Sequence, residues 1–242
     1  MYRIGVVRMI DIHCHLLYGV DDGPENMDES IAMLKKAAEQ GVTDIILTPH
    51  YRRGMFKFDK EQVLKNKAAL DKYAEEIGIQ LHLGTEFHVN GDILEYLETG
   101  RCLTLAGSEY VLTEYEYGTD YAYILKMTQE LLRHGYIPVI AHVERYACIV
   151  KKPQHLDELQ EIGALIQMNA GAIIGEEGWG AKAFCKKVLK QGWVDVVASD
   201  SHDRKKRACY LEDCYDYVTE KYGEKLAYKL MIKNPKKMIQ GE

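Results

Sequence analysis

The chain of 242 residues lacks the features that define several large classes of protein. It has no stretch of roughly 20 consecutive apolar residues, the length that a membrane-spanning helix needs, so we expect no membrane insertion. Its first eight residues lack the long apolar core of a secretory signal, which favours a cytoplasmic location. Only five prolines, with 28% charged and 47% hydrophobic residues, are typical of a soluble globular protein.

Several kinds of catalytic and binding motif are also missing. The six cysteines form no CxxC pair and show no zinc-ribbon spacing, so we expect reduced thiols rather than a disulfide scaffold. None of them is followed six residues later by the arginine that a cysteine-nucleophile phosphatase needs. The sequence contains no GxxxxGK[ST] phosphate loop, no GxSxG elbow and no HExxH helix. The net charge of −6 argues against nucleic acid as the main partner.

What the chain does contain is a series of apolar segments that end in residues able to bind a metal. In the first, residues 10–15, the alternation of a β-strand predicts that Asp11, His13 and His15 share one face, so that two imidazoles converge. Five further segments are likewise apolar first and polar at their carboxyl ends, namely residues 44–50, 79–86, 110–114, 137–142 and 195–202. Residues 164–169 form one more expected strand, whose last residue, Asn169, is no obvious ligand but could orient one.

Segments with helical periodicity separate these strands, giving seven rounds of strand followed by helix. Such alternation predicts a parallel sheet wrapped by helices, and a closed barrel brings all carboxyl strand ends to one rim. An open doubly wound sheet is the alternative, but it would spread those ends along a line. We therefore predict an α/β fold, a distorted TIM-like (β/α)7 barrel, as one domain over residues 9–242, with residues 1–8 as an N-terminal extension.

A single rim would gather a mixed set of imidazoles and carboxylates. Such a set exceeds the shell of one ion, usually about four to six ligands, and fits two or three ions that share bridging carboxylates. Nitrogen and oxygen ligands without thiolate suit Mn²⁺, Fe²⁺ or Zn²⁺. We expect Asp11 to orient an imidazole from behind, and Glu116 and Asp21 are the alternatives to Glu114 and Asp22. The nine predicted ligands are His13, His15, Asp22, His50, Glu86, Glu114, His142, Asp200 and His202.

Five short motifs together carry a resemblance to a known family. They are MIDIHCH at 9–15, VDDGP at 20–24, TPH at 48–50 with RGMF at 53–56, IAHVERY at 140–146 and ASDSH at 198–202. In combination they resemble the manganese-dependent protein tyrosine phosphatases of bacterial capsular and exopolysaccharide systems, a branch of the polymerase and histidinol phosphatase (PHP) superfamily. The resemblance extends from Met9 to about Ile239.

The resemblance implies a PHP barrel of seven strands with three metal ions on the same nine residues. It also implies arginines that bind phosphate, at Arg145 and Arg207, although the basic run at 204–207 leaves Arg204 as a rival to Arg207. The expected reaction is hydrolysis of a phosphotyrosine ester by hydroxide from a water shared by the metals, with no phosphorylated enzyme intermediate. An arginine fork on the remaining phosphate oxygens would orient the substrate.

The implied substrate is the acidic, tyrosine-phosphorylated tail of a membrane-associated tyrosine kinase of polysaccharide export. Tyr51 and Tyr146 follow ligand motifs closely and are expected to contact the aryl group, together with Tyr115. Arg52 lies in a basic loop after a ligand and is expected to attract the acidic tail. The sequence permits a homo-oligomer without deciding the oligomeric state.

Three other functions fit parts of the pattern. A related phosphatase could act on histidinol phosphate or a nucleotide, and only its substrate profile would distinguish it. A nuclease has support only from the basic loops near Arg52 and Lys205. The third alternative is a metal-binding scaffold that has lost catalysis. The complete set of nine predicted ligands argues against it.

Overall fold

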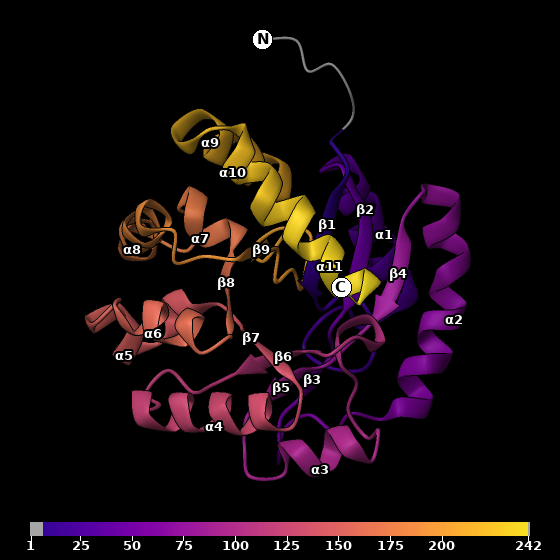
Figure 1. The fold of residues 1–242 in the computed structure, drawn as a ribbon. Coiled ribbons are helices and arrows are strands. Elements are labelled where there is room, and N and C mark those ends of the chain that lie inside the picture. The colour runs from indigo at the N-terminus through magenta and orange to yellow at the C-terminus, as the bar shows by residue number, and fades with distance from the viewer. Residues whose placement is uncertain (1–6, 242) are drawn as a thin grey trace.

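The computed structural model describes residues 7–241, in which strands and helices alternate around a curled parallel sheet (Figure 1). Most of the predicted extension, residues 1–6 of 1–8, therefore lies outside the described residues. No helix among the described residues is long and apolar enough to cross a membrane. The strands are β1 (Met9–Cys14), β2 (Val42–Leu47), β3 (His50–Tyr51), β4 (Gln80–Leu83), β5 (Glu86–His88), β6 (Tyr110–Glu114), β7 (Ile137–Ile140), β8 (Leu165–Asn169) and β9 (Val196–Ala198).

Two of the predicted strands are interrupted just before their ligands. The expected strand 44–50 divides into β2 and β3, and the expected strand 79–86 divides into β4 and β5. Pro49 has no backbone N–H to donate, but its carbonyl accepts from the backbone of Glu86 at 3.2 Å. At the second break a Cβ on Gly84 would lie 2.8 Å from the side chain of Leu105, so the close packing there requires glycine. The two breaks leave the order of the strands unchanged.

The strands follow one another around a barrel. One sheet has the order β1-β2-β4 and the other β3-β5-β6-β7-β8-β9, with all strand pairs parallel. Beyond β9, the backbone of Asp200 donates to His13 at 2.9 Å and that of His15 donates to Ser201 at 3.0 Å, which joins the last strand to the first. With each interrupted strand counted once, seven strands surround the interior within residues 7–241, as predicted.

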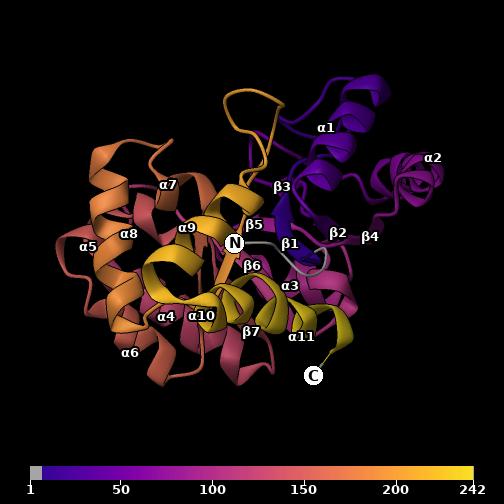
Figure 2. The same cartoon turned by 90° about the horizontal axis from the view of Figure 1, so that it is seen from above.

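Helices cover the outside of the sheet and one end of the barrel (Figures 1 and 2). The side chains of Asn26 and Asp59 cap the first two helices. The helices are α1 (Met27–Glu39), α2 (Lys60–Ile77), α3 (Ile93–Glu98), α4 (Tyr121–Arg133), α5 (Ala147–Lys151), α6 (His155–Glu161), α7 (Ala170–Ile174), α8 (Trp179–Gln191), α9 (Leu211–Tyr222), α10 (Glu224–Tyr228) and α11 (Asn234–Gln240), with the 3-10 helices η1 (Leu105–Gly107) and η2 (Val143–Arg145) and the π-helix η3 (Lys229–Lys233).

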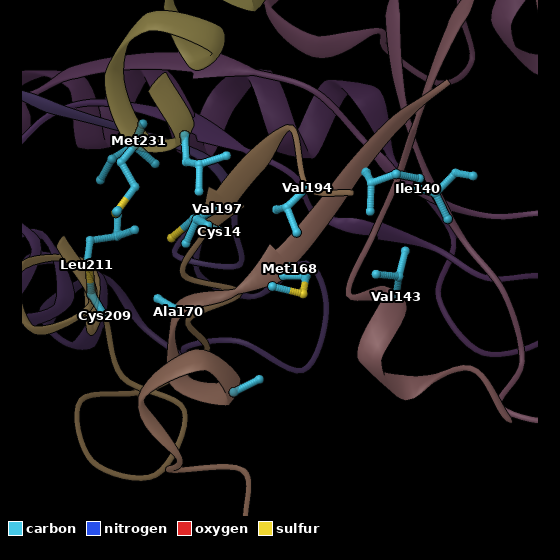
Figure 3. Packing of buried hydrophobic residues seen from close by; sticks show 14 of the residues in the cluster. Cys14, Ile140, Val143, Met168, Ala170, Val194, Val197, Cys209, Leu211 and Met231 are labelled. Carbon is cyan, nitrogen blue, oxygen red and sulfur yellow. The ribbon is translucent and has the colours of Figure 1, made fainter. Parts of the chain in front are cut away.

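Two hydrophobic clusters place the polar end of the barrel. The smaller cluster gathers Ile12, Ile46, Leu112 and Val139 from neighbouring strands with Met238 of α11, so apolar side chains fill the interior towards the helix that ends the chain. The larger cluster lies between the sheet and the outer helices, and Figure 3 shows part of it around β8 and β9. Because these regions are closely filled with apolar groups, the carboxyl ends of the strands are left to carry the buried polar residues.

Candidate metal centre

All nine predicted ligands meet at the carboxyl ends of the strands. Their candidate ligand atoms form four overlapping groups, within each of which the atoms lie within 4.8 Å of one another. The four groups share members, as ligands of neighbouring ions would. The groups are His15, Asp22, His50 and His202; His13, His15 and Asp200; His13, Glu86 and His142; and His50, Glu86 and Glu114.

Glu86 lies at the centre of the nine residues. Its Oε2 is 3.3 Å from Nε2 of His13, 3.1 Å from Nε2 of His15 and 2.9 Å from Nδ1 of His50. Its Oε1 is 2.9 Å from Nε2 of His142. Burial alone would raise the pKa of this carboxyl group, but His13 and His50 outweigh it and hold the pKa well below its usual range. A carboxylate surrounded by four imidazoles would hold a metal ion together with them.

A second carboxylate, Asp22, faces the outer histidines. Its Oδ1 lies 3.4 Å from Nε2 of His50 and 3.2 Å from Nε2 of His202. The rings of His15 and His202 stack with centroids 3.9 Å apart, and Phe56 stacks on His50 at 5.3 Å. These ring contacts fix the imidazole planes around Asp22.

Asp200 links the histidines of β1 to two arginines. Its Oδ1 is 3.4 Å from Nε2 of His13, while Nη1 of Arg145 lies 2.8 Å from its Oδ2 and Nη2 of Arg207 lies 3.1 Å from its Oδ1. Both Asp200 and the ligand His142 have positive φ angles, 51° and 32°. Non-glycine residues seldom adopt this backbone region, and such strain is concentrated at functional sites.

The chemistry of these atoms fits a metal cluster. Four buried atoms of the predicted ligands lie near opposite charges but form no hydrogen bond of acceptable angle among the described residues: Nδ1 of His50, Oε2 of Glu86, Oε2 of Glu114 and Nε2 of His202. Burying polar atoms without partners costs about 1 to 3 kcal/mol each, a cost that metal coordination would remove. Atoms that share an ion through bonds of about 2.1 Å lie roughly 3 to 3.5 Å apart, which is the spacing seen around Glu86. The donor set contains only nitrogen and oxygen.

The residue that orients His15 is Asp21, which the sequence offered only as a substitute for Asp22. Its Oδ2 lies 2.8 Å from Nδ1 of His15 and accepts from the backbone of His50 at 3.1 Å, while its Oδ1 accepts from the backbone of Gly23 at 3.0 Å. Burial lowers the pKa of His15, but Asp21 and Glu86 outweigh it, so the pKa lies well above its usual value. Nδ1 of His15 is thereby engaged, which leaves Nε2 to face Glu86.

The prediction that Asp11 orients an imidazole was wrong. Its carboxylate accepts from the backbone and the hydroxyl of Ser199 instead. The reason is an irregularity in β1: Asp11 pairs with Ile45 and Cys14 with Leu47, so one strand advances three residues while its neighbour advances two. A bulge of this kind breaks the two-residue alternation, and Asp11 no longer shares the face of the histidines.

Two cavities flank the cluster. One, of about 440 Å³, is lined by the ligands Glu114 and His142 and by Arg52, Arg145 and Tyr117, among others. The other, of about 550 Å³, is lined by Asp22 and His202 and by the loop 203–207. Arg145 and Arg52 therefore lie beside two of the predicted ligands at an open cavity, and their contact with a substrate stays a prediction.

Of the two rival arginines, Arg207 is the one whose side chain contacts the predicted ligands among residues 7–241. Its Nη1 donates to Oδ2 of Asp22 at 3.3 Å, in addition to its contact with Asp200. Arg204 is exposed in the loop, whose backbone is held by the carboxylate of Asp203. These contacts favour Arg207 over Arg204 as the second candidate for binding phosphate.

The predicted role of Tyr51 was wrong. It follows His50 on β3, so it projects to the opposite face, where its ring packs against Phe87 and Tyr96 at 4.7 and 4.8 Å. Tyr146 lies at the edge of the smaller cavity but is only 1% exposed, and its hydroxyl is 3.4 Å from Nδ1 of His142. The same hydroxyl accepts from the backbone of Tyr115 at 3.2 Å, so Tyr146 contacts both a predicted ligand and the residue after β6.

A parallel barrel that gathers histidines and carboxylates where its strands end has the architecture of a metal-dependent barrel enzyme. The family model described as capsular polysaccharide synthesis, CpsB/CapC, matches residues 9–240, and the chain belongs to this family.

Curated relatives and a solved structure agree with this membership. The tyrosine-protein phosphatase CpsB of Streptococcus pneumoniae is 36% identical over 241 residues, which cover 97% of this chain and 99% of that protein. The tyrosine-protein phosphatase YwqE of Bacillus subtilis is 34% identical over 224 residues, 92% of this chain and 88% of that protein. A crystal structure from work on YwqE and CpsB, described as unique metal-dependent tyrosine phosphatases, matches with a TM-score of 0.91 at 32% identity and covers 97% of this chain and 95% of its own. The predicted fold and enzyme class, a phosphatase, are confirmed.

Proposed function

We propose that this protein is a metal-dependent tyrosine-protein phosphatase of capsule or exopolysaccharide synthesis that acts in the cytoplasm. The observation that carries the proposal is Glu86 at the centre of four imidazoles, with Arg145 and Arg207 on the neighbouring carboxylate of Asp200. The names of the relatives, tyrosine-protein phosphatases, support the substrate class. Manganese, an ion count of two or three, and membership of the PHP superfamily are part of the proposal, and Fe²⁺ and Zn²⁺ are the alternatives to manganese.

The nine predicted ligands would hold the ions; Glu86 belongs to two of the four groups, whereas Asp22 and Asp200 each belong to one. When bound, such ions polarise the phosphate and supply a water-derived nucleophile at neutral pH. Arg145 and Arg207 would bind the phosphate oxygens, since guanidinium groups match phosphate geometry.

No thiol takes part in this proposal. Burial raises the pKa of the cysteine side chains, to about 12 for Cys102, so they remain protonated and are poor nucleophiles at neutral pH. In addition, no cysteine is followed six residues later by the arginine that a cysteine-nucleophile phosphatase needs.

The cavity beside Glu114 is the proposed entry for the substrate. The rings of Tyr115 and Tyr117 border it, and Arg52 stands at its edge with the side chain 31% exposed. An aromatic ester could enter there with its phosphate towards Arg145, while Arg52 meets the acidic residues of a peptide. The proposed partner is the tyrosine-phosphorylated tail of a bacterial kinase.

The proposal is tested by a panel of four substrates measured with Mn²⁺: a phosphotyrosine peptide, a phosphoserine peptide, histidinol phosphate and single-stranded DNA. We expect the phosphotyrosine peptide to be hydrolysed fastest and activity to disappear with a chelator. A clear preference for histidinol phosphate would reject the substrate class, and cleavage of DNA would favour the nuclease alternative. The panel run on His13→Ala protein, which lacks one ligand, is the control for a contaminating phosphatase.

A further inference from the structure

Strand β8 brings no predicted ligand to the rim, yet its two polar side chains contact three of the ligand residues. Gln167 and Asn169 stand two residues apart and project from the same face of the strand. Both are buried, with 0% and 1% of their surface exposed. Buried amides of this kind must have their hydrogen bonds satisfied by the protein. The hydrogen-bond partners of the two side chains therefore indicate their role.

The direction of the hydrogen bonds at Gln167 follows from one group whose role is fixed. The backbone N–H of His142 can only donate, and it lies 2.9 Å from Oε1 of Gln167, which identifies that atom as the amide oxygen. The same oxygen is 3.2 Å from Nδ1 of His13. When His13 is neutral, as a metal ligand must be, Nδ1 carries the proton. The lone pair is then on Nε2, which lies 3.1 Å from Nε2 of His15 and faces Glu86 and Asp200.

The bonds continue in one direction along β8. Nε2 of Gln167 donates to Oδ1 of Asn169 at 2.9 Å, and Nδ2 of Asn169 donates to Oδ2 of Asp200 at 2.9 Å. Oδ2 of Asp200 is thereby held away from the histidines, while its Oδ1 faces His13. The backbone N–H of Asn169 is fixed in turn by Oε1 of Glu144 at 3.0 Å.

We propose that Gln167 and Asn169 are positioning residues that select the metal-binding tautomer of His13 and set the direction of the Asp200 carboxylate. This inference rests on the proposed metal-binding role of the cluster. It gives β8 the function that Asp21 has for His15, with one difference: the amide adds no charge to a site that already holds the carboxylates of Asp22, Glu86, Glu114 and Asp200. Groups behind a metal ligand commonly change metal affinity about 10- to 100-fold when they are removed.

The first test needs no variant. In Zn²⁺-loaded protein, in which the ion is diamagnetic, long-range ¹H–¹⁵N spectra of histidine-labelled chain report which ring nitrogen carries the proton. We expect His13 to be protonated at Nδ1 and unprotonated at Nε2. A proton on Nε2 of His13 would overturn the inference.

The second test measures Mn²⁺ affinity by adding the ion to metal-free protein against a competing chelator. Gln167→Leu removes the contacts of the amide with His13, His142 and Asn169 and should weaken binding about 10- to 100-fold. Gln167→Glu keeps an acceptor for His13 and His142 and should recover part of the affinity. The matched control is Met168→Leu, a change of similar volume between Gln167 and Asn169 on the same strand. Met168 packs in the hydrophobic cluster (Figure 3), so this substitution should leave Mn²⁺ binding unchanged.

The outcomes separate the inference from the proposed function. If wild-type protein binds no Mn²⁺, the metal-site proposal itself fails. If it binds Mn²⁺ and folded Gln167→Leu binds equally well, or if Met168→Leu loses as much, the positioning role is rejected. Should Gln167→Leu not fold, Asn169→Ser replaces it, because this change removes the donor to Asp200 and leaves Gln167 in place; unchanged affinity in that variant would count against the proposal.

Discussion

Nη1 of Arg145 lies 2.8 Å from Oδ2 of Asp200, and this pair joins the edge of an open cavity to the middle of the ligand cluster. The side chain of Arg145 is 36% exposed, whereas that of Asp200 is 2% exposed. The guanidinium therefore reaches the cluster while part of it remains accessible from the cavity. This is the position from which an arginine could bind a phosphate held by the metals.

Arg145→Ala should lower kcat/KM by about 10- to 100-fold, as expected when a charge-assisted contact of about 1.5 to 3 kcal/mol is lost. The loss should be similar for a phosphotyrosine peptide and for p-nitrophenyl phosphate, because the two substrates share the phosphate. Steady-state kinetics with both substrates at saturating Mn²⁺ provide the measurement. A loss confined to the peptide would show that Arg145 does not bind the phosphate.

Arg52→Ala should impair hydrolysis of the peptide much more than that of the small ester. Arg52 pairs with Glu116 at the border of the cavity and is placed to meet groups beyond the phosphate. The matched control is Arg53→Ala, since Arg53 is 75% exposed, pairs with Asp92 and lies outside the lining of that cavity. Equal effects of Arg52→Ala on both substrates would reject a role in binding the peptide.

Asp21→Asn should weaken Mn²⁺ binding about 10- to 100-fold without unfolding the protein. The carboxylate holds Nδ1 of His15 at 2.8 Å, and an amide would no longer provide a charged acceptor there. Competition titration of metal-free protein measures the affinity. Glu116→Gln serves as the control because Glu116 is 61% exposed and pairs with Arg52 rather than with a ligand. Unchanged binding in Asp21→Asn would contradict the orienting role.

Glu144 predicts a dependence of stability on pH in the metal-free protein. Burial, reinforced by the charge of Glu177, raises the pKa of Glu144 from 4.5 to about 8. The folded protein therefore holds this proton more tightly than the unfolded chain, so the group destabilises the fold increasingly as the pH rises from about 4.5 to 8. Glu144→Gln, which stays neutral, should stabilise the protein more at about pH 8.5 than at about pH 5.

Urea unfolding at the two pH values measures this difference. The replacement keeps a side-chain oxygen for the backbone N–H of Asn169, so the local hydrogen bond is preserved. Glu161→Gln, on the exposed surface of α6, is the control and should show no comparable pH dependence. The expectation fails if wild-type and Glu144→Gln proteins differ by the same free energy of unfolding at both pH values.

Much of the fold and the ligand set could be predicted because both depend on local patterns. An apolar run that ends in His50 or Glu114 specifies a strand and the chemistry of its carboxyl end at once. The repetition of that pattern around a barrel brings residues that are distant in sequence to one rim. The positions of the ligand residues therefore followed from the sequence before any contact was known.

The residues behind the ligands were harder to predict, since their roles depend on irregularities that local patterns do not report. The bulge in β1 moved Asp11 off the histidine face, and the loop conformation decided that Asp21 rather than Asp11 holds His15. Strand alternation alone could have predicted two features: that Tyr51 lies on the face opposite to His50, and that Gln167 and Asn169 share a face.

If the nine predicted ligands of one chain hold more than one metal ion, and if these ions are needed for phosphotyrosine hydrolysis, active protein must contain them. Metal analysis by mass spectrometry, on fully active protein purified without a chelator, measures how many ions each chain holds. We expect more than one transition-metal ion per chain, with both occupancy and turnover sharply reduced in His13→Ala protein. Fully active protein that contains a single ion or none would contradict this expectation.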